Sequence, residues 1–310
     1  MKKNVLTAIS GGQDSIYLIE ILKKLRKHQK LQAYNLHIIY IYIDHQWRND
    51  SKTNVKHIIN YIKSINGNIH VYQDKYKILS ESDSRIIRYH IIFQHALKNK
   101  CQLIVTAHNK TDKIETFLQN LLRGCGIEGA TSLITHCISD TDLNIFRPLL
   151  NTTRNQIYWK CKRYNLPIWS DMTNYIYNIQ RNRTRNELVP YLKKYFHNNL
   201  EKNIEYLLKS YYYDSEYIRQ SVIKVYLNII HNKYISINYQ KLKKQNIALQ
   251  FRTIQLFSFH NLRIQLDHKI VNHIVKTINN KLSIVNIDIK YKYLIFNFNR
   301  NWMYLKIQKY

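Results

Sequence analysis

Residues 5–15 read VLTAISGGQDS, a stretch that predicts a strand, a glycine-rich turn and the start of a helix. The apolar run from Val5 to Ile9 has the length and β-branched content of a buried strand, and helical periodicity begins near Ser15. The glycines between them let backbone N–H groups turn toward an anion, and the helix N-terminus adds its dipole. The pattern predicts a phosphate site. A glycine turn in which Asp14 or Ser15 only caps the helix explains these residues equally well.

The predicted phosphate loop consists of Ser10, Gly11, Gly12, Gln13, Asp14 and Ser15. It is not a Walker A loop, because the G-x-x-x-x-G-K-[ST] pattern is absent and a carboxylate stands where a lysine would be expected. A carboxylate beside phosphates needs a bridging cation. The loop therefore implies Mg²⁺, with Asp14 as its protein ligand.

Up to about residue 196, short β-rich runs alternate with longer helical stretches, which indicates an α/β fold with a parallel sheet and helices on its faces. The expected strands are Asn4–Ser10, Leu36–Asp44, Ile69–Tyr72 and Leu103–Ala107. The expected helices are Ser15–His28, Asn54–Ser64, Ser82–Asn99 and Thr111–Arg123. Because Asp14, Asp44 and His108 all follow predicted strands, we expect them at the carboxyl edge of the sheet, where such folds bind ligands.

Beyond residue 196 the sequence changes character, with helical stretches rich in Tyr and Lys. We expect a helix at Asp267–Asn279 and strands at Leu282–Asp288, Leu294–Asn297 and Met303–Ile307. The apolar periodicity lapses between Lys193 and Asn199. The sequence thus predicts two domains, residues 1–196 and residues 197–310, the second smaller and mixed helical and β.

The 310 residues include 48 Lys plus Arg against 20 Asp plus Glu, a formal net charge of +28. Charge of this size favours a polyanionic partner, with nucleic acid ahead of an anionic membrane. No apolar run is long enough to span a bilayer, and the loop interrupts the apolar N-terminus before a signal peptide could form. We therefore expect a soluble protein without a membrane partner.

The four cysteines, Cys101, Cys125, Cys137 and Cys161, form no C-x-x-C pair. Their spacing suggests neither a zinc ribbon nor an iron–sulfur site. We interpret them as reduced thiols in a reducing compartment.

The loop resembles the S-G-G-x-D-S motif of the ATP pyrophosphatases, enzymes that cleave ATP between its α and β phosphates. Further segments indicate which family of ATP pyrophosphatases the chain resembles. They are Ile43 to Gln46, Glu81 to Tyr89, Ala107 to Thr116, Leu121 to Gly126, Arg147 to Leu150, Asp171 to Asn174 and Arg181 to Arg185. In this order they resemble the tRNA(Ile)-lysidine synthetase family over residues 1 to about 195. The C-terminal elements more weakly resemble that family's first C-terminal domain. No second such domain follows, so the resemblance is to a short form.

The resemblance implies an adenine-nucleotide-hydrolase-like, Rossmann-like catalytic domain that uses ATP. It also implies two substrates, free lysine and the isoleucine tRNA with a CAU anticodon. ATP would adenylate the C2 oxygen of the wobble cytidine and release pyrophosphate. The ε-amine of lysine would then displace AMP to give lysidine.

The resemblance also implies roles for individual residues. Arg88 matches the second arginine of the family's R-x-x-R-Y element and would stabilise charge on the α-phosphate. Asp112 and Glu115 match the positions that contact lysine, and their spacing from His108 places all three on one helical face. His108 is a candidate base for the lysine ammonium. Judged without the other motifs, the two carboxylates read as solvent-facing charges paired with neighbouring lysines.

Two positions depart from the family pattern. Thr111 replaces the first of the paired aspartates that usually precede the lysine-contacting glutamate, and Ile176 stands where an aspartate usually follows the D-x-[ST]-N element. Because Asp112 remains, we expect an active enzyme.

Basic residues after the motifs predict the RNA contacts: Arg181, Arg183, Arg185, Lys193 and Lys194. These side chains would grip phosphates near the site, and exposed tyrosines would stack on unpaired bases. A cytidine thiolase and a non-catalytic basic RNA-binding protein are the alternatives. The composition is typical of an AT-rich genome, so we expect an enzyme of the plastid stroma, or else of a bacterial cytoplasm. The sequence does not decide between a monomer and a homodimer.

Overall fold

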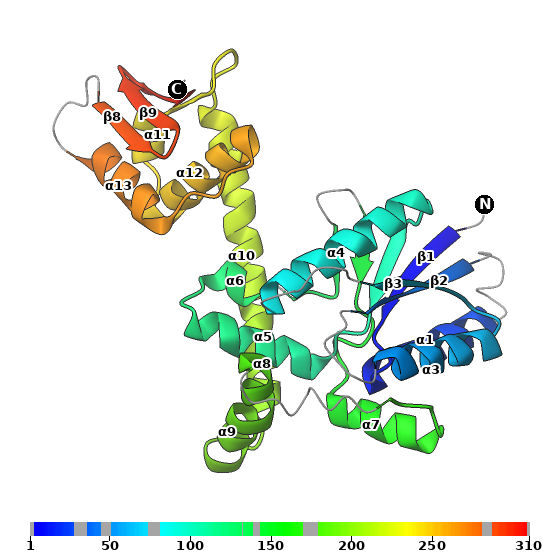
Figure 1. The fold of residues 1–310 in the computed structure, drawn as a ribbon. Coiled ribbons are helices and arrows are strands. Elements are labelled where there is room, and N and C mark those ends of the chain that lie inside the picture. Colours follow the sequence, from blue (N-terminus) through cyan, green and yellow to red (C-terminus); the bar gives the residue numbers. More distant parts are fainter. Residues whose placement is uncertain are drawn as a thin grey trace. The chain divides into compact units, whose positions relative to one another are not determined.

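The computed structural model describes residues 3–27, 36–44, 51–73, 81–131, 133–138, 143–169, 179–280 and 287–308. His45, the element Asp171 to Asn174, Ile176 and the predicted strand residues 282–286 lie outside them. The chain divides into two compact units, Met1–Lys209 and Ser210–Tyr310 (Figure 1). Each unit has its own sheet.

The first unit is built on a sheet of six strands in the order β3-β2-β1-β4-β6-β5. The strands are β1 (Lys3–Ile9), β2 (Leu36–Asp44), β3 (Asn68–Gln73), β4 (Leu103–Thr106), β5 (His136–Ile138) and β6 (Asn144–Phe146). All neighbours pair in parallel except β5 with β6. The chain moves from β1 to β2 on one side and returns to β4 on the other. This reversal creates a switch point at the carboxyl end of β1, the usual place for a ligand.

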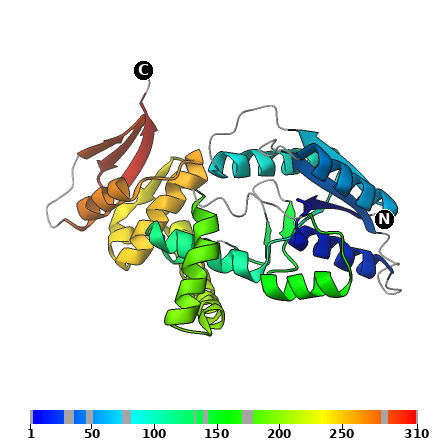
Figure 2. The same cartoon turned by 60° about the horizontal axis from the view of Figure 1, so that its bottom comes forward.

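Helices cover both faces of this sheet (Figures 1 and 2). On one face α4 (Glu81–Lys98) packs Ile92 and Ala96 against Leu6 and Ile41. The other face carries α1 (Gln13–Lys27), α3 (Ser51–Ser64) and α7 (Arg154–Arg163). Because side chains alternate along a strand, neighbouring residues of β1 enter different cores.

The remaining helices of the first unit follow β4 and β6. They are α5 (Lys110–Leu122), α6 (Ile127–Ala130), α8 (Gln180–Arg183), the π-helix η2 (Thr184–Leu188), α9 (Val189–Tyr195) and the start of α10 (Leu200–Ile229). A capping box holds the start of α5, since Asn109 and Asp112 exchange hydrogen bonds of 3.0 Å between side chain and backbone. This cap fixes the direction in which α5 leaves the sheet.

The predicted α/β class is confirmed, and the expected helices and strands of the first unit are present with ends shifted by a few residues. The first unit also contains elements that were not expected from the sequence: β5, β6, α6, α7, α8, η2 and α9. The extra strand pair extends the sheet beyond β4, and three-residue strands carry too little periodicity to be recognised.

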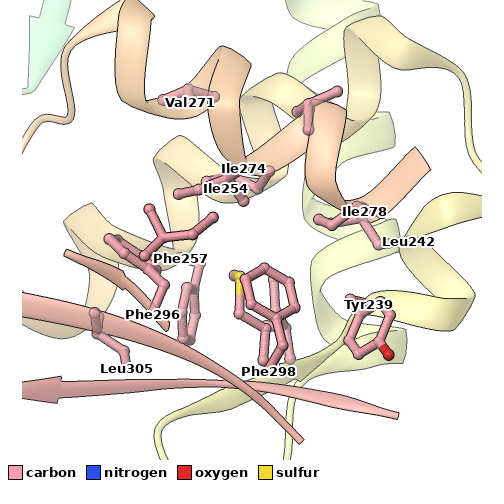
Figure 3. Packing of buried hydrophobic residues seen from close by; sticks show 14 of the residues in the cluster. Tyr239, Leu242, Ile254, Phe257, Val271, Ile274, Ile278, Phe296, Phe298 and Leu305 are labelled. Carbon is pink, nitrogen blue, oxygen red and sulfur yellow. The ribbon is translucent and has the colours of Figure 1, made fainter. Parts of the chain in front are cut away.

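The second unit has an antiparallel sheet in the order β7-β10-β9-β8. Its strands are β7 (Ser236–Asn238), β8 (Ile287–Tyr291), β9 (Leu294–Asn299) and β10 (Trp302–Ile307). The helices α11 (Tyr239–Lys243), α12 (Ile247–Leu262) and α13 (His268–Asn279) complete it. Phe257, Ile274, Phe296 and Phe298 meet in the core between helices and sheet and have no exposed surface (Figure 3).

The expected helix and the last two strands of this region are present, while β8 extends to Tyr291, beyond the expected end at Asp288. The lapse in periodicity near residue 196 corresponds to the break between α9 and α10. The division between the compact units falls later, inside α10. No helix in the described part of the chain is both long and apolar enough to cross a membrane.

Candidate active site

The glycine-rich loop between β1 and α1 has a backbone that requires glycine at one position. Gly11 has φ +81°, and a Cβ there would lie 2.5 Å from Ile58 Cδ1 and 2.9 Å from Asn54 Oδ1. The Ser15 hydroxyl closes the loop, donating to Gly12 O at 2.9 Å and accepting from Ser10 N at 3.2 Å. The loop is therefore a tight turn pressed against α3, with Ser15 holding it from inside.

A cavity of about 440 Å³ opens beside this loop at the carboxyl edge of the sheet. The residues predicted for the site that line it are Ser10, Gly12, Gln13, Asp14, Ser15, Asp44, Arg88, His108, Asp112, Arg181 and Arg185. They come from the segments that follow β1 and β4, from the end of β2, and from α1, α4, α5, α8 and η2. The topology of the parallel sheet thus brings the separate motifs to one pocket, and the volume suits a nucleotide-sized ligand.

The other predicted residues lie outside the lining. Gly11 is a buried residue of the loop and Glu115 is fully buried, and neither lines the cavity. Arg183 is exposed and pairs with Glu187 at 3.0 Å. Lys193 pairs with Glu201, and Lys194 lies 5.0 Å from the ring centroid of Tyr195.

Two carboxylates of α5 and two arginines of the α8–η2 segment form an ion-pair network in the wall. Arg185 binds Glu115 through Nε at 2.6 Å and Nη2 at 2.8 Å, and its Nη2 also lies 3.1 Å from Asp112 Oδ1. Arg181 contacts the same carboxylates at 3.0 and 3.2 Å. In the solvent-facing interpretation, Asp112 and Glu115 would pair with neighbouring lysines. Here they are instead buried and bound to arginines.

Burial and charge act in opposite directions on Asp112. Burial alone would raise the pKa of its carboxyl, but Arg181, His108 and the backbone N–H of Asn109 together hold that pKa below its usual value. Asp112 is therefore ionised at neutral pH, as a contact for a cation requires.

His108 is held as a neutral imidazole. Burial, together with the charges of Arg85, Arg147 and Arg181, lowers the pKa of His108 to about 3, although Asp112 acts in the opposite direction. Its Nδ1 lies 2.9 Å from the Thr106 hydroxyl. The ring can exchange hydrogen bonds with a ligand, but with this pKa it is a weak base.

The pKa of Asp14 is raised, whereas the pKa values of Asp112 and His108 are lowered. Burial raises the pKa of its carboxyl to about 6, while the charge of Arg154 acts to lower it. The contacts described for its carboxylate include the Gln13 amide at 3.4 Å. A carboxylate that lost water on folding gains from a cation brought in by a ligand, which agrees with the prediction of a metal-bridged phosphate at this loop.

Several residues of the pocket were not predicted from the sequence. Tyr42, Asn54, Arg85, Tyr89, Arg154 and Trp169 also line the cavity. Arg85 carried a signal, since it is the first arginine of the R-x-x-R-Y element. Arg154 follows the Arg147 to Leu150 segment, and no pattern in the sequence set it apart from the chain's many other basic residues.

Thr111, one of the two departures from the family pattern, has a visible role. Its hydroxyl accepts the backbone N–H of Arg154 at 3.2 Å and so ties the start of α7 to the start of α5. A threonine can form this contact but adds no negative charge.

The chain matches the PP-loop domain family over residues 1–192. It is 43% identical over 307 residues to the chloroplastic tRNA(Ile)-lysidine synthase of Gracilaria tenuistipitata, a match that covers 98% of this chain and 92% of that protein. The chain belongs to the tRNA(Ile)-lysidine synthase family.

Two further members of the family are similar to this chain over most of its length. The chloroplastic synthase of Pyropia yezoensis is 33% identical over 97% of this chain and 89% of its own length. The synthase of the bacterium Thermosynechococcus vestitus is 30% identical over 86% of this chain and 76% of its own. The predicted enzyme class, a ligase that acts in tRNA processing, is confirmed by this membership.

Among solved structures, a U34-tRNA thiolase from Methanococcus maripaludis, with a [4Fe-4S] cluster, has a similar fold. The TM-score is 0.55 with 15% sequence identity, and the match covers 67% of this chain and 72% of the thiolase. At this identity the likeness concerns the fold alone.

The four cysteines are free thiols in the described part of the chain. Cys101 and Cys161 are buried, and burial raises the pKa of the Cys161 thiol to about 11. Within the described ranges, no three or more His, Cys, Asp or Glu side chains are placed to hold a metal ion.

Proposed function

We propose that the cavity at the glycine-rich loop carries out both steps of lysidine formation on the isoleucine tRNA with a CAU anticodon. In the first step the C2 oxygen of the wobble cytidine attacks the α-phosphorus of ATP, and the bond from that phosphorus to the bridging oxygen of pyrophosphate breaks. In the second, the ε-amine of lysine bonds to C2, loses its proton, and AMP leaves with the oxygen. The convergence of the loop, Asp112 and five arginines on one cavity carries this proposal.

ATP is the nucleotide that PP-loop membership implies, and we assign its phosphates to the loop from Ser10 to Ser15. The loop N–H groups and the start of α1 suit the terminal phosphates. Mg²⁺ fits the donor set as a metal bound by one carboxylate, that of Asp14, and by phosphate oxygens. When bound, the ion would neutralise phosphate charge. Asp44, buried at the end of β2, faces the same cavity.

Arg88 is assigned to the α-phosphate, where charge builds up as the cytidine oxygen attacks. It lines the cavity from α4. A positioned guanidinium in a partly enclosed pocket stabilises such charge more strongly than the same group in water.

Lysine is assigned to the α5 carboxylates of Asp112 and Glu115. Each already binds two arginines, so the substrate's ammonium must share or replace an arginine contact. His108 beside them is too weak a base to take the ammonium proton efficiently, and we assign it to hydrogen bonding instead. The carboxylates favour the charged ammonium, whereas loss of water around the amine favours its neutral, nucleophilic form, and the proton must leave before the amine attacks.

RNA contacts are assigned to the α8–α9 segment, with Arg181, Arg183, Arg185, Lys193 and Lys194 as candidates. An arginine that holds Glu115 is not available to a phosphate at the same time, so exposed Arg183 and Lys194 are the better first contacts. Tyr195 and Phe196 on the same segment are 62% and 70% exposed and offer stacking surfaces.

The plastid location expected from the composition agrees with the chloroplastic names of the relatives from Gracilaria and Pyropia. The enzyme would then modify a plastid isoleucine tRNA. The unmodified methionine tRNA, which shares the CAU anticodon, is the competing substrate that the enzyme must reject.

The test uses purified enzyme with ATP, Mg²⁺, labelled lysine and CAU-anticodon isoleucine tRNA, followed by digestion to nucleosides. Labelled lysidine is expected, and the methionine tRNA with the same anticodon serves as the matched control. In a parallel reaction, a sulfur donor replaces lysine. Sulfur incorporation without lysidine would contradict the proposal and favour the thiolase alternative.

A further inference from the structure

We propose that Arg154 binds the terminal phosphates of ATP and stabilises pyrophosphate as it leaves. This inference deepens the proposed function, on which it rests for the identity of the nucleotide. It concerns a residue outside the motifs that suggested the site.

The backbone of Arg154 is held from two sides at the mouth of the loop. Its N–H donates to the Thr111 hydroxyl at 3.2 Å, and its carbonyl accepts from Gln13 Nε2 at 3.4 Å. Arg154 is also the first residue of α7, with Thr153 as the N-cap. The Cα therefore has a defined place between the phosphate loop and α5, and its side chain lines the cavity beside Gln13 and Asp14.

The ion pairs of the pocket distinguish Arg154 from two of its other four arginines. Five arginines line the cavity: Arg85, Arg88, Arg154, Arg181 and Arg185. Arg181 and Arg185 are neutralised by Asp112 and Glu115. In the described structure, the Arg154 guanidinium has no carboxylate within ion-pair distance, so its charge is available to a ligand.

The loop itself is short of positive charge. Its side chains are neutral apart from Asp14, which is negative when ionised, and a phosphate bound there adds further negative charge. Arg154 is near enough to Asp14 to act on the pKa of that carboxyl. A guanidinium at this place supplies the positive charge that other phosphate loops obtain from a lysine.

The chemistry of the first step gives this charge a role. As the bond from the α-phosphorus to the bridging oxygen breaks, its electron pair stays on pyrophosphate, whose negative charge rises. The planar guanidinium can donate two parallel hydrogen bonds to phosphate oxygens and stabilises that charge. Arg88 on the opposite face then serves the α-phosphate, and Arg154 serves the leaving group.

The test compares ligands with and without the terminal phosphates in an Arg154→Gln variant. We expect the dissociation constants of ATP and of inorganic pyrophosphate, each with Mg²⁺, to rise by roughly ten- to a hundredfold, the value of one charged hydrogen-bond contact. The dissociation constant of AMP should change by less than about twofold in the same variant. Arg154→Lys keeps the charge and should recover part of the ATP affinity. The matched control is Arg163→Gln, at the exposed end of the same helix.

Equal losses of ATP and AMP affinity would overturn the assignment, because they would mean that Arg154 only supports the shape of the pocket. Unchanged ATP affinity would overturn it as well. If Arg154→Gln does not fold, the same comparison is made with Arg154→Met, which keeps the aliphatic stem and removes the charge. These measurements need neither tRNA nor lysine, so an enzyme that binds ATP through Arg154 yet makes no lysidine would refute the proposed function alone.

Discussion

Arg185 holds Glu115 through two nitrogens, with Nε 2.6 Å from Oε1 and Nη2 2.8 Å from Oε2. Glu115 has no exposed surface, so this carboxylate depends on its arginines for all compensation of lost hydration. The pair joins α5 to η2, which are far apart in the chain. Any ligand that uses Glu115 must enter an existing ion-pair network, and this couples lysine binding to the stability of the site.

Glu115→Gln should therefore show two effects. Apparent lysine affinity should fall by roughly ten- to a hundredfold, and unfolding free energy should fall by about 3 to 5 kcal/mol because a buried charge partner is removed. Pyrophosphate release before lysine attack should change much less. The measurements are a lysine titration of lysidine formation, pyrophosphate release with and without lysine, and urea unfolding. Unchanged lysine affinity with collapsed pyrophosphate release would place Glu115 in the nucleotide site.

Asp112→Asn should change how stability depends on pH. Because folding lowers the pKa of Asp112, the ionised carboxylate stabilises the fold above about pH 4, its unfolded value, and this contribution is lost as pH falls below that. Asparagine keeps the capping geometry without the charge. The difference in unfolding free energy between wild type and variant should be large at pH 7 and shrink toward pH 3. A pH-independent difference in urea melts would contradict the assigned charge role.

Asp14→Asn should abolish AMP formation and leave tRNA affinity nearly unchanged, since Asp14 is the carboxylate of the phosphate loop. Removing one electrostatic group at a reacting centre typically costs about 3 kcal/mol or more. The readouts are AMP release and a filter-binding measurement with the tRNA. Wild-type turnover would falsify the assignment of Asp14 to the metal-bridged phosphate.

Gly11→Ala should disrupt the loop through its backbone. The added Cβ would meet Ile58 and Asn54, and φ +81° is unfavourable for alanine. ATP affinity should fall at least tenfold, about 1.4 kcal/mol. Gly126→Ala is the matched control, because nothing lies within 4 Å of the position its Cβ would take. Equal ATP affinity in both variants would show that the loop backbone does not bind the nucleotide.

Replacing all four cysteines by serine should leave specific activity intact. Cys101 and Cys161 are buried, so some thermal stability should be lost, whereas Cys125 and Cys137 are half-buried and should matter less. Activity is compared per folded molecule, with the single variants as controls. A soluble, folded Cys→Ser variant without activity would return the thiolase alternative.

The local elements could be read from the sequence because their signals are local. The apolar run of β1, the glycines after it and the periodicity of α1 lie within one short stretch, and they dictate a strand, a tight turn and a helix. Repetition of that pattern indicated a parallel sheet, which in turn predicted that Asp14, Asp44 and His108 would meet. All three line one cavity.

The partners of charged groups could not be read in this way. Arg181 and Arg185 had the same appearance as Arg183, a basic residue in a basic chain, yet the first two hold buried carboxylates and the third lies at the surface. The sequence around a charged side chain has no periodic pattern that identifies an ion-pair partner some seventy residues away in the chain. Local patterns in the sequence were enough to predict the succession of strands and helices, the phosphate loop and the residues gathered at the sheet edge. The strand order and the pairing of charges, which leaves Arg154 available, came from the tertiary structure, because burial and distance set those energies.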